Sequence, residues 1–125
     1  MTIQEALDMA DQLKPNMMAR PLKIRFLNEL EGMIHEEILM KHEHTTAEEE
    51  RPEYDTETDP ETVLLVPAPY DMLYVFWLVS RIDYQNMEMD KYNNDRALFE
   101  NAYRQAADWW NRTKMPIQKT REIRI

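Results

Sequence analysis

Apolar residues recur at helical spacing in four stretches of the chain, and this pattern predicts an all-α fold. The first stretch, at 2–13, opens with Thr2-Ile3-Gln4-Glu5, a capping box in which Thr2 and Glu5 bond each other's backbone amides. The second, at 21–40, starts at Pro21, a favoured first-turn residue. Its buried seam is Leu27, Leu30, Ile34 and Ile38, with Glu29, Glu31, Glu36 and Glu37 largely off that seam. Gly32, in mid-helix, is expected to mark a close helix crossing.

Two further helices are expected at 69–86 and 88–112, joined at Asn86-Met87 with almost no loop. Each carries an aromatic stripe, and together they contain all three Trp residues. Apolar side chains cover more than half the circumference of the third helix, which predicts a central position among its neighbours. Asn86 is expected to end that helix in the left-handed conformation.

The remaining segments lack periodicity and differ sharply in charge. Residues 43–61 contain nine acidic side chains against Arg51 alone, and they predict a solvated acidic loop. Residues 112–125 contain five cationic side chains against Glu122 alone. We therefore expect one domain at 1–116, a four-helix bundle-like fold with a long central helical hairpin and an acidic loop. An extended basic C-terminal tail follows at 117–125.

Composition narrows the possible functions. The formal net charge of −9 argues against a general DNA-binding protein, because phosphate affinity comes from clustered Lys and Arg. The absence of Cys excludes disulfides and thiolate metal sites. No apolar run approaches the roughly 20 residues that span a bilayer, so no membrane association is expected. The first residues include an early acid and lack the basic start of a signal peptide, so no signal peptide is expected.

The chain offers few residues for chemistry. His35-Glu36-Glu37 begins like a zinc-protease motif, but position 39 is Leu39 where a second His is needed. His42 and His44 flank Glu43, and we interpret them as a solvated helix end. We expect no metal, no cofactor and no enzymatic activity. Asp83, inside an apolar helix, requires a partner, and a structural ion pair is expected among Arg81, Asp83, Arg96 and Arg104.

Several runs along the chain carry a likeness to known proteins. The runs are Leu13-Lys14-Pro15-Asn16, Lys23-Ile24-Arg25-Phe26-Leu27, Pro67-Ala68-Pro69-Tyr70-Asp71, Ile82-Asp83-Tyr84, Tyr92-Asn93-Asn94 and Asn111-Arg112-Thr113, followed by Met115-Pro116. They resemble small proteins encoded by tailed phages and prophages of Firmicutes. The likeness spans nearly the whole chain and is clearest at 67–116. At Met87 the chain departs from these proteins, in which Gly is expected.

Those proteins are similar to head–tail connector proteins, the adaptors that complete the phage head. The resemblance implies a homo-oligomeric ring in the virion, assembled in the host bacterial cytoplasm, that binds the portal protein and neighbouring copies, or a stopper or tail protein. It implies no specific nucleic acid binding. The residues expected to bind the partner are Lys114, Lys119, Arg121, Ile123, Arg124 and Ile125. The competing interpretation is a small acidic helical regulator whose acidic loop mimics DNA, although such a mimic needs no basic tail.

Overall fold

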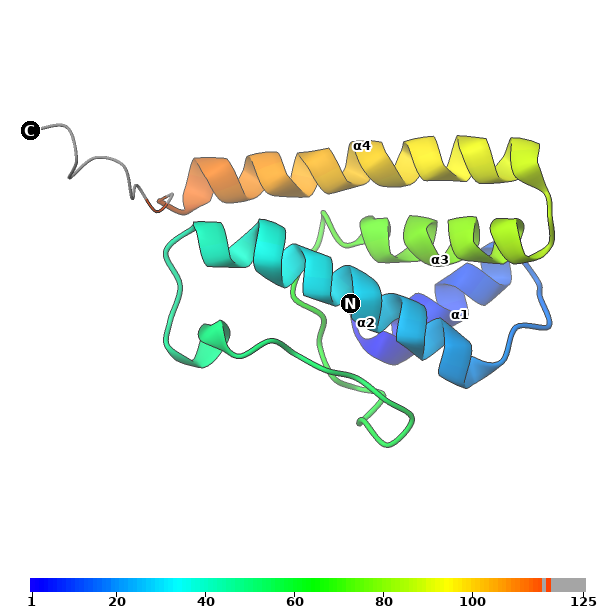
Figure 1. Cartoon of the computed structure of the whole chain (residues 1–125), viewed down its shortest axis with the longest axis horizontal. Helices are drawn as coiled ribbons and strands as arrows, with labels where there is room; N and C mark the ends of the chain where they lie inside the picture. Colours follow the sequence, from blue (N-terminus) through cyan, green and yellow to red (C-terminus); the bar gives the residue numbers. More distant parts are fainter. Residues whose placement is uncertain (116, 118–125) are drawn as a thin grey trace, which may run out of the picture.

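The computed structural model of the chain describes residues 1–115 and 117. The third helix is central: α4 lies along one side of it, and α1 and α2 pack on the other (Figure 1). This confirms the predicted all-α fold with its antiparallel helical hairpin. The elements in chain order are α1 (Ile3–Leu13), α2 (Arg20–Glu37), η1 (Leu39–Lys41), η2 (Ala47–Glu49), α3 (Met72–Gln85) and α4 (Met89–Thr113).

The central position of α3 follows from its composition. Nine of its 14 residues are buried, including Tyr74, Trp77 and Asp83. α4 is amphipathic by contrast, and only Phe99, Ala106 and Trp110 are buried in its 25 residues. A helix that is apolar nearly all round must be covered, whereas a helix with one apolar stripe can form an outer wall.

Two predicted helix boundaries are wrong by about three residues. α2 ends at Glu37, because the Ile38 carbonyl accepts a hydrogen bond from His42 Nδ1 (2.7 Å) while the chain tightens into η1. α3 begins at Met72 rather than near 69, after a cis peptide bond between Ala68 and Pro69. The capping box at the start of α1 is present as predicted.

The turn between α3 and α4 is a Schellman motif, and its left-handed residue is Met87 rather than Asn86. Met87 has φ 59°, whereas Asn86 has φ −83°. The Met87 amide donates to the Tyr84 carbonyl (3.0 Å), and the Glu88 amide donates to the Asp83 carbonyl (2.9 Å). These two hydrogen bonds define the motif, in which Gly normally takes the left-handed position.

Glu31 is buried inside the protein, which corrects its predicted position off the seam. Its side chain is inaccessible to solvent and accepts three hydrogen bonds. Tyr74 Oη donates to Oε1 (2.6 Å), while Tyr54 Oη and the Leu65 amide donate to Oε2 (2.8 and 3.0 Å). Tyr74 Oη in turn accepts from the Val66 amide (2.9 Å). One carboxylate therefore connects α2, α3 and both ends of the 54–66 segment.

Burial raises the pKa of Glu31, and the hydrogen bonds from Tyr74, Leu65 and Tyr54 oppose that rise without cancelling it. The pKa values of Tyr74 and Tyr54 are also raised, first by burial and then by the neighbouring carboxylate. A raised carboxyl pKa stabilises the fold below the unfolded-state pKa, and this contribution is lost as pH rises through the folded-state value. Ionised Glu31 therefore destabilises the fold at neutral pH relative to its protonated form. The packing of α2, α3 and the 54–66 segment around it must offset that cost.

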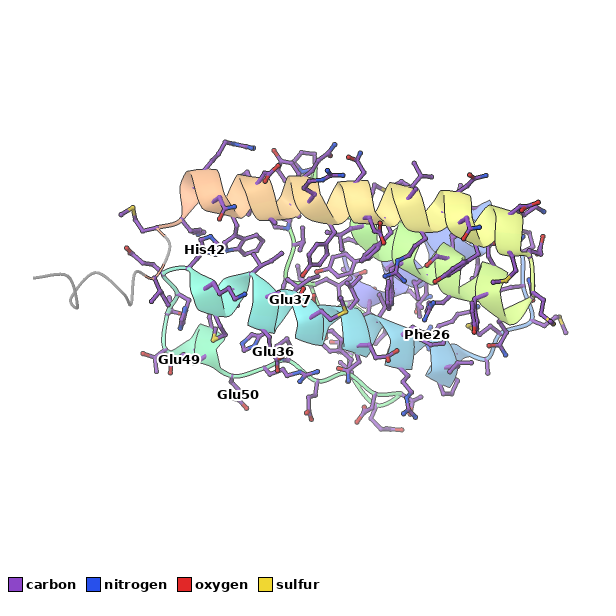
Figure 2. All side chains as sticks on the ribbon, turned by 45° about the horizontal axis from the view of Figure 1, so that its top comes forward. Phe26, Glu36, Glu37, His42, Glu49 and Glu50 are labelled. Atoms are coloured by element: carbon purple, nitrogen blue, oxygen red, sulfur yellow. The ribbon has the colours of Figure 1, made fainter. Side chains whose placement is uncertain are left out.

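The acidic loop after η1 is attached to α2 rather than freely solvated. His35 Nε2 donates to the Glu48 carbonyl (2.8 Å), and the Tyr54 amide donates to Asn28 Oδ1 (2.9 Å). The Arg51 guanidinium lies against Gly32, where any Cβ would collide with it. The close approach at Gly32 is thus with a loop side chain and not, as predicted, with another helix. Figure 2 shows Glu36, Glu49 and Glu50 on this loop side of α2.

Replacing Met87 with Gly should stabilise the protein by about 1 kcal/mol. The left-handed conformation costs an L-residue roughly 1–2 kcal/mol, and the extra unfolded-state entropy of Gly returns part of that gain. Urea unfolding followed by Trp fluorescence measures the change. Met87→Ala keeps the strain and should change stability by less than about 0.5 kcal/mol. A destabilised Met87→Gly variant would show that the turn is not strained.

Replacing Glu31 with Leu should reduce the free energy of unfolding by about 3 kcal/mol or more. It leaves the Leu65 amide and the Tyr74 hydroxyl buried without an acceptor, and each such group costs roughly 1–3 kcal/mol. Glu29→Leu, an exposed change on the same helix, is the matched control and should stay within about 0.5 kcal/mol of the wild type. Equal effects of the two substitutions in urea unfolding would refute the role given to Glu31.

Candidate functional site

A groove of about 450 Å³ lies where the end of α1 meets the α3–α4 hairpin. Its floor is acidic, formed by Asp83 of α3 and Asp95 of α4, and its walls are mostly apolar. We call it the acidic groove. The residues that line it are Leu13, Lys14, Phe76, Val79, Asp83, Lys91, Asp95 and Leu98.

Asp83 is the deepest charged residue of the acidic groove. Its side chain has no exposed area, and neither carboxylate oxygen has a hydrogen-bond partner among the described residues. Lys14 Nζ approaches Asp83 Oδ1 to 3.3 Å, at a geometry that forms an ion pair without a good hydrogen bond. The same Nζ lies 2.7 Å from Glu88 Oε1, a much closer contact. Lys14 is therefore divided between two carboxylates and satisfies Asp83 incompletely.

The charges of this site shift each other's ionisation. Burial, together with the adjacent Asp83 carboxylate, raises the pKa of Asp95 to about 6. Hydrogen bonds from Lys14 and Lys91 lower the pKa of Glu88 to about 2. The hydrogen bond to Glu88 is the main reason that the pKa of Lys14 is raised. Asp95 is thus the group whose charge is least compensated by a neighbouring ammonium.

The predicted ion pair of Asp83 has a different partner from those proposed. Asp83 pairs with Lys14, not with Arg81, Arg96 or Arg104. Residues two apart on a helix point about 200° apart, so Arg81 and Asp83 face opposite sides of α3. Arg96 instead pairs with Glu100 (3.3 Å), and Arg104 lies exposed on α4. Lys14 gave no strong signal in the sequence, beyond a cation that ends a helix just before Pro15.

Arg81 and Arg96 belong to an aromatic cluster on the α2 side of the hairpin. The Arg81 guanidinium carbon lies 5.0–5.8 Å from the ring centroids of Phe26, Trp77, Tyr84 and Tyr92. Arg96 lies 5.5 Å from the Trp77 centroid. Cation–π contacts therefore stabilise Arg81 in place of the expected carboxylate. Phe26 stands at this side of α2 in Figure 2.

Both ring nitrogens of His42 have a hydrogen-bond partner within the fold, so this residue has a structural role. The ring is buried, with Nδ1 on the Ile38 carbonyl and Nε2 2.7 Å from Asn111 Oδ1. It joins the end of α2 to the end of α4 (Figure 2). His44 bonds the His42 carbonyl through Nδ1 (2.7 Å). Within residues 1–115 and 117, no cluster of three or more side chains could hold a metal ion.

The chain that follows α4 is joined to the chain that follows α2. The Glu43 amide donates to the Met115 carbonyl (2.8 Å), and the Ile117 amide donates to the Lys41 carbonyl (2.8 Å). Lys114 is exposed beside this contact. The other predicted partner-binding residues lie outside the described part of the chain: Lys119, Arg121, Ile123, Arg124 and Ile125.

Comparison of the chain with protein-family models, with characterised proteins and with solved structures finds no match. None of the helices in the described part of the chain is long and apolar enough to cross a bilayer. The function of the protein must therefore be inferred from its surface features, above all from the acidic groove and from the segment that follows α4.

Replacing Asp95 with Asn should raise the melting temperature at about pH 7.5, where the carboxylate pair repels itself, but not at about pH 4. The folded-state pKa of about 6 exceeds the ordinary Asp pKa of 3.8, so the contribution of Asp95 to stability is complete at low pH. It is lost as pH rises through about 6, and Asn removes that loss.

Circular dichroism melts at several pH values measure this effect. Asp108→Asn removes an exposed carboxylate from the same helix and is the control, with little change expected at either pH. If Asp95→Asn shifted the melting temperature by the same amount at every pH, the carboxylate pair would not be the cause.

Proposed function

We propose that this chain is a structural protein of a phage virion, a head–tail adaptor that binds the portal protein and helps to complete the head. The resemblance at 67–116 motivates this proposal, and that region forms the α3–α4 hairpin. The two helices pack along their length, with Trp77 against Phe99 (centroids 5.0 Å apart) and Tyr84 against Tyr92 (5.4 Å). Such a hairpin is suited to a stiff wall in an assembly.

The observation that carries the proposal is the fixed point from which the basic segment starts. The hydrogen bonds between Glu43 and Met115 and between Lys41 and Ile117 hold the chain at one end of the hairpin. His42 reinforces the same corner through Asn111. A cationic segment that starts from a fixed point, in a chain of net charge −9, is suited to docking on another protein.

In the proposed assembly, the hairpin forms the wall, and the basic segment docks on the portal or on an adjacent copy. A contact between unlike patches on equivalent subunits closes into a ring when the rotation allows it. The acidic loop exposes Glu49, Glu50 and Glu53 to solvent, where they repel packaged DNA. Charge complementarity sets register and association rate, while apolar contacts supply most of the affinity.

One observation favours the regulator that mimics DNA as a second candidate. His35 and Asn28 fix the backbone of the acidic loop, so its carboxylates keep definite positions, as a phosphate mimic requires. Competition between this protein and duplex DNA for a purified host DNA-binding protein would test that function. If the protein is an adaptor, it should not compete with duplex DNA for the host protein. The gene order offers an independent check. An adaptor gene has the portal and capsid genes upstream of it and the tail genes downstream.

Removing residues 118–125 should leave a folded protein that no longer decorates portals. The described contacts of Lys41 and Glu43 are kept, so circular dichroism and the melting temperature should match those of the full chain. Binding is measured by cosedimentation with the portal protein of the same phage genome and by electron microscopy of the complexes. A full-length variant with Lys119, Arg121 and Arg124 changed to Gln separates charge from length. Normal decoration by the truncated chain would exclude the docking role.

A further inference from the structure

The lining of the acidic groove holds the carboxylates of Asp83 and Asp95 and the ammonium groups of Lys14 and Lys91. Glu88 lies outside the lining but pairs with both lysines, so that the carboxylates of the cluster outnumber its ammonium groups by three to two. Both ammonium groups lie closest to Glu88, at 2.7 and 2.8 Å. Of the two aspartates, Asp83 is fully buried and has the longer Lys14 contact of 3.3 Å, and Asp95 forms no ion pair among the described residues. A buried carboxylate without a well-formed partner is costly, so the site favours the arrival of another cation.

The rim of the acidic groove is apolar and unusually exposed. Leu13 retains 60% of its accessible surface and Leu98 retains 49%, on either side of the aspartates. Phe76 and Val79 form the wall between them. An aliphatic rim around an acidic floor is complementary to a cationic side chain that has aliphatic neighbours.

The chain itself contains a segment with that chemistry. Residues 118–125 read Gln-Lys-Thr-Arg-Glu-Ile-Arg-Ile, with Ile123 and Ile125 on either side of Arg124. A guanidinium can bond the accessible Asp95 carboxylate through two parallel N–H donors, whereas an ammonium acts as a point charge. Arg124 therefore fits the floor of the groove, and the two isoleucines fit its leucine rim.

The groove lies at the limit of what its own C-terminal segment can reach. Asp95 precedes Thr113 by 18 residues of α4, about 27 Å at 1.5 Å per residue. The chain beyond α4 is bound to Lys41 and Glu43 at the far end of the hairpin. Four residues separate Ile117 from Arg121, which reach at most about 14 Å, and Arg124 comes within range only on a straight path along α4. A second copy can supply the same residues without that restriction.

We propose that the acidic groove is the receptor for residues 118–125 of a second copy of this chain, with Arg124 at the accessible Asp95 carboxylate above the buried Asp83, and Ile123 and Ile125 against Leu13 and Leu98. This inference rests on the proposed function and specifies its contact between copies. Each copy carries one groove and one basic segment, so copies join head to tail. Such a contact is heterologous and builds a ring or an open filament according to its rotation.

A peptide titration tests the receptor directly. Isotope-labelled full-length protein is titrated with a synthetic peptide of residues 114–125 and followed by NMR. The amides of Phe76, Asp95 and Leu98 should shift and saturate. Asp95→Asn should weaken binding at least tenfold, while the exposed control Asp108→Asn binds as the wild type does. A peptide with Arg121 and Arg124 changed to Gln should not bind. Shifts confined to other surfaces, or equal binding by Asp95→Asn, would overturn the proposal.

Complementary variants test whether the contact joins two copies. The groove variant is Asp95→Lys and the segment variant is Arg121→Glu with Arg124→Glu, both full-length. Each should be monomeric by sedimentation velocity at concentrations where the wild type self-associates. An equimolar mixture should form a one-to-one complex, because it contains one intact groove and one intact segment. The matched control Asp108→Lys should associate as the wild type does.

The possible outcomes separate this inference from the proposed function. A wild type that stays monomeric throughout, or a groove variant that associates normally, overturns the second-copy receptor. If Asp95→Lys decorates portals normally while the chain lacking 118–125 does not, the adaptor function stands and the receptor lies elsewhere. If Asp95→Lys proves unfolded by circular dichroism, the milder Asp95→Asn variant in the same sedimentation assay decides the matter.

Discussion

The fold depends on one buried carboxylate, that of Glu31. The 54–66 segment directs two hydrogen-bond donors at this α2 carboxylate and α3 directs a third, and no other acceptor is found for these donors among the described residues. Because an unpaired carboxylate and unpaired donors are both costly in the interior, α2, α3 and the 54–66 segment are stable only together. The segment then leads directly into α3, so the same contact sets where the central helix begins. The α3–α4 hairpin, and with it the acidic groove, is thus positioned by a polar interaction inside an otherwise apolar core.

The two faces of α3 carry opposite charges, Arg81 on one and Asp83 on the other, and the two charges have different kinds of partner. On the α2 side, the Arg81 charge is spread over aromatic rings, one of which, Trp77, also donates to the Phe26 carbonyl (2.9 Å). The interactions that stabilise this cluster are cation–π contacts between residues of the same chain. On the α1 side, the Asp83 charge meets a single lysine that Glu88 holds more closely. On the first face the chain supplies cation–π partners for Arg81, although Arg81 Nε has no hydrogen-bond partner among the described residues. On the second face we propose that a cation from another copy completes the site. This asymmetry is the reason to look for an interface at the α1 side of the hairpin.

Local signals in the sequence predicted the elements well. The capping box at Thr2, Pro21 and the recurrence of apolar residues at helical spacing predicted four helices, because each signal acts within a few residues. Long-range partners were harder to predict. Glu31 lies at helical spacing from Leu27 and Ile34, so the seam pattern alone could have revealed its burial. The Lys14–Asp83 pair could not be read in the same way, since helix packing decides which of several cations reaches a buried acid. His42 was assigned to solvent because its partner, Asn111, is 69 residues away.

The central claim is that the acidic groove of one copy receives the C-terminal residues of another, and a paramagnetic label measures that contact most directly. The chain has no Cys, so Thr120→Cys provides one labelling site. A spin label at this position on unlabelled protein, mixed with isotope-labelled wild type, broadens only the amides that it approaches in a different molecule. The account predicts broadening at Lys91, Asp95 and Leu98 that disappears with Asp95→Lys. Broadening that centres on the 43–61 loop, or none at all under conditions of self-association, would contradict it.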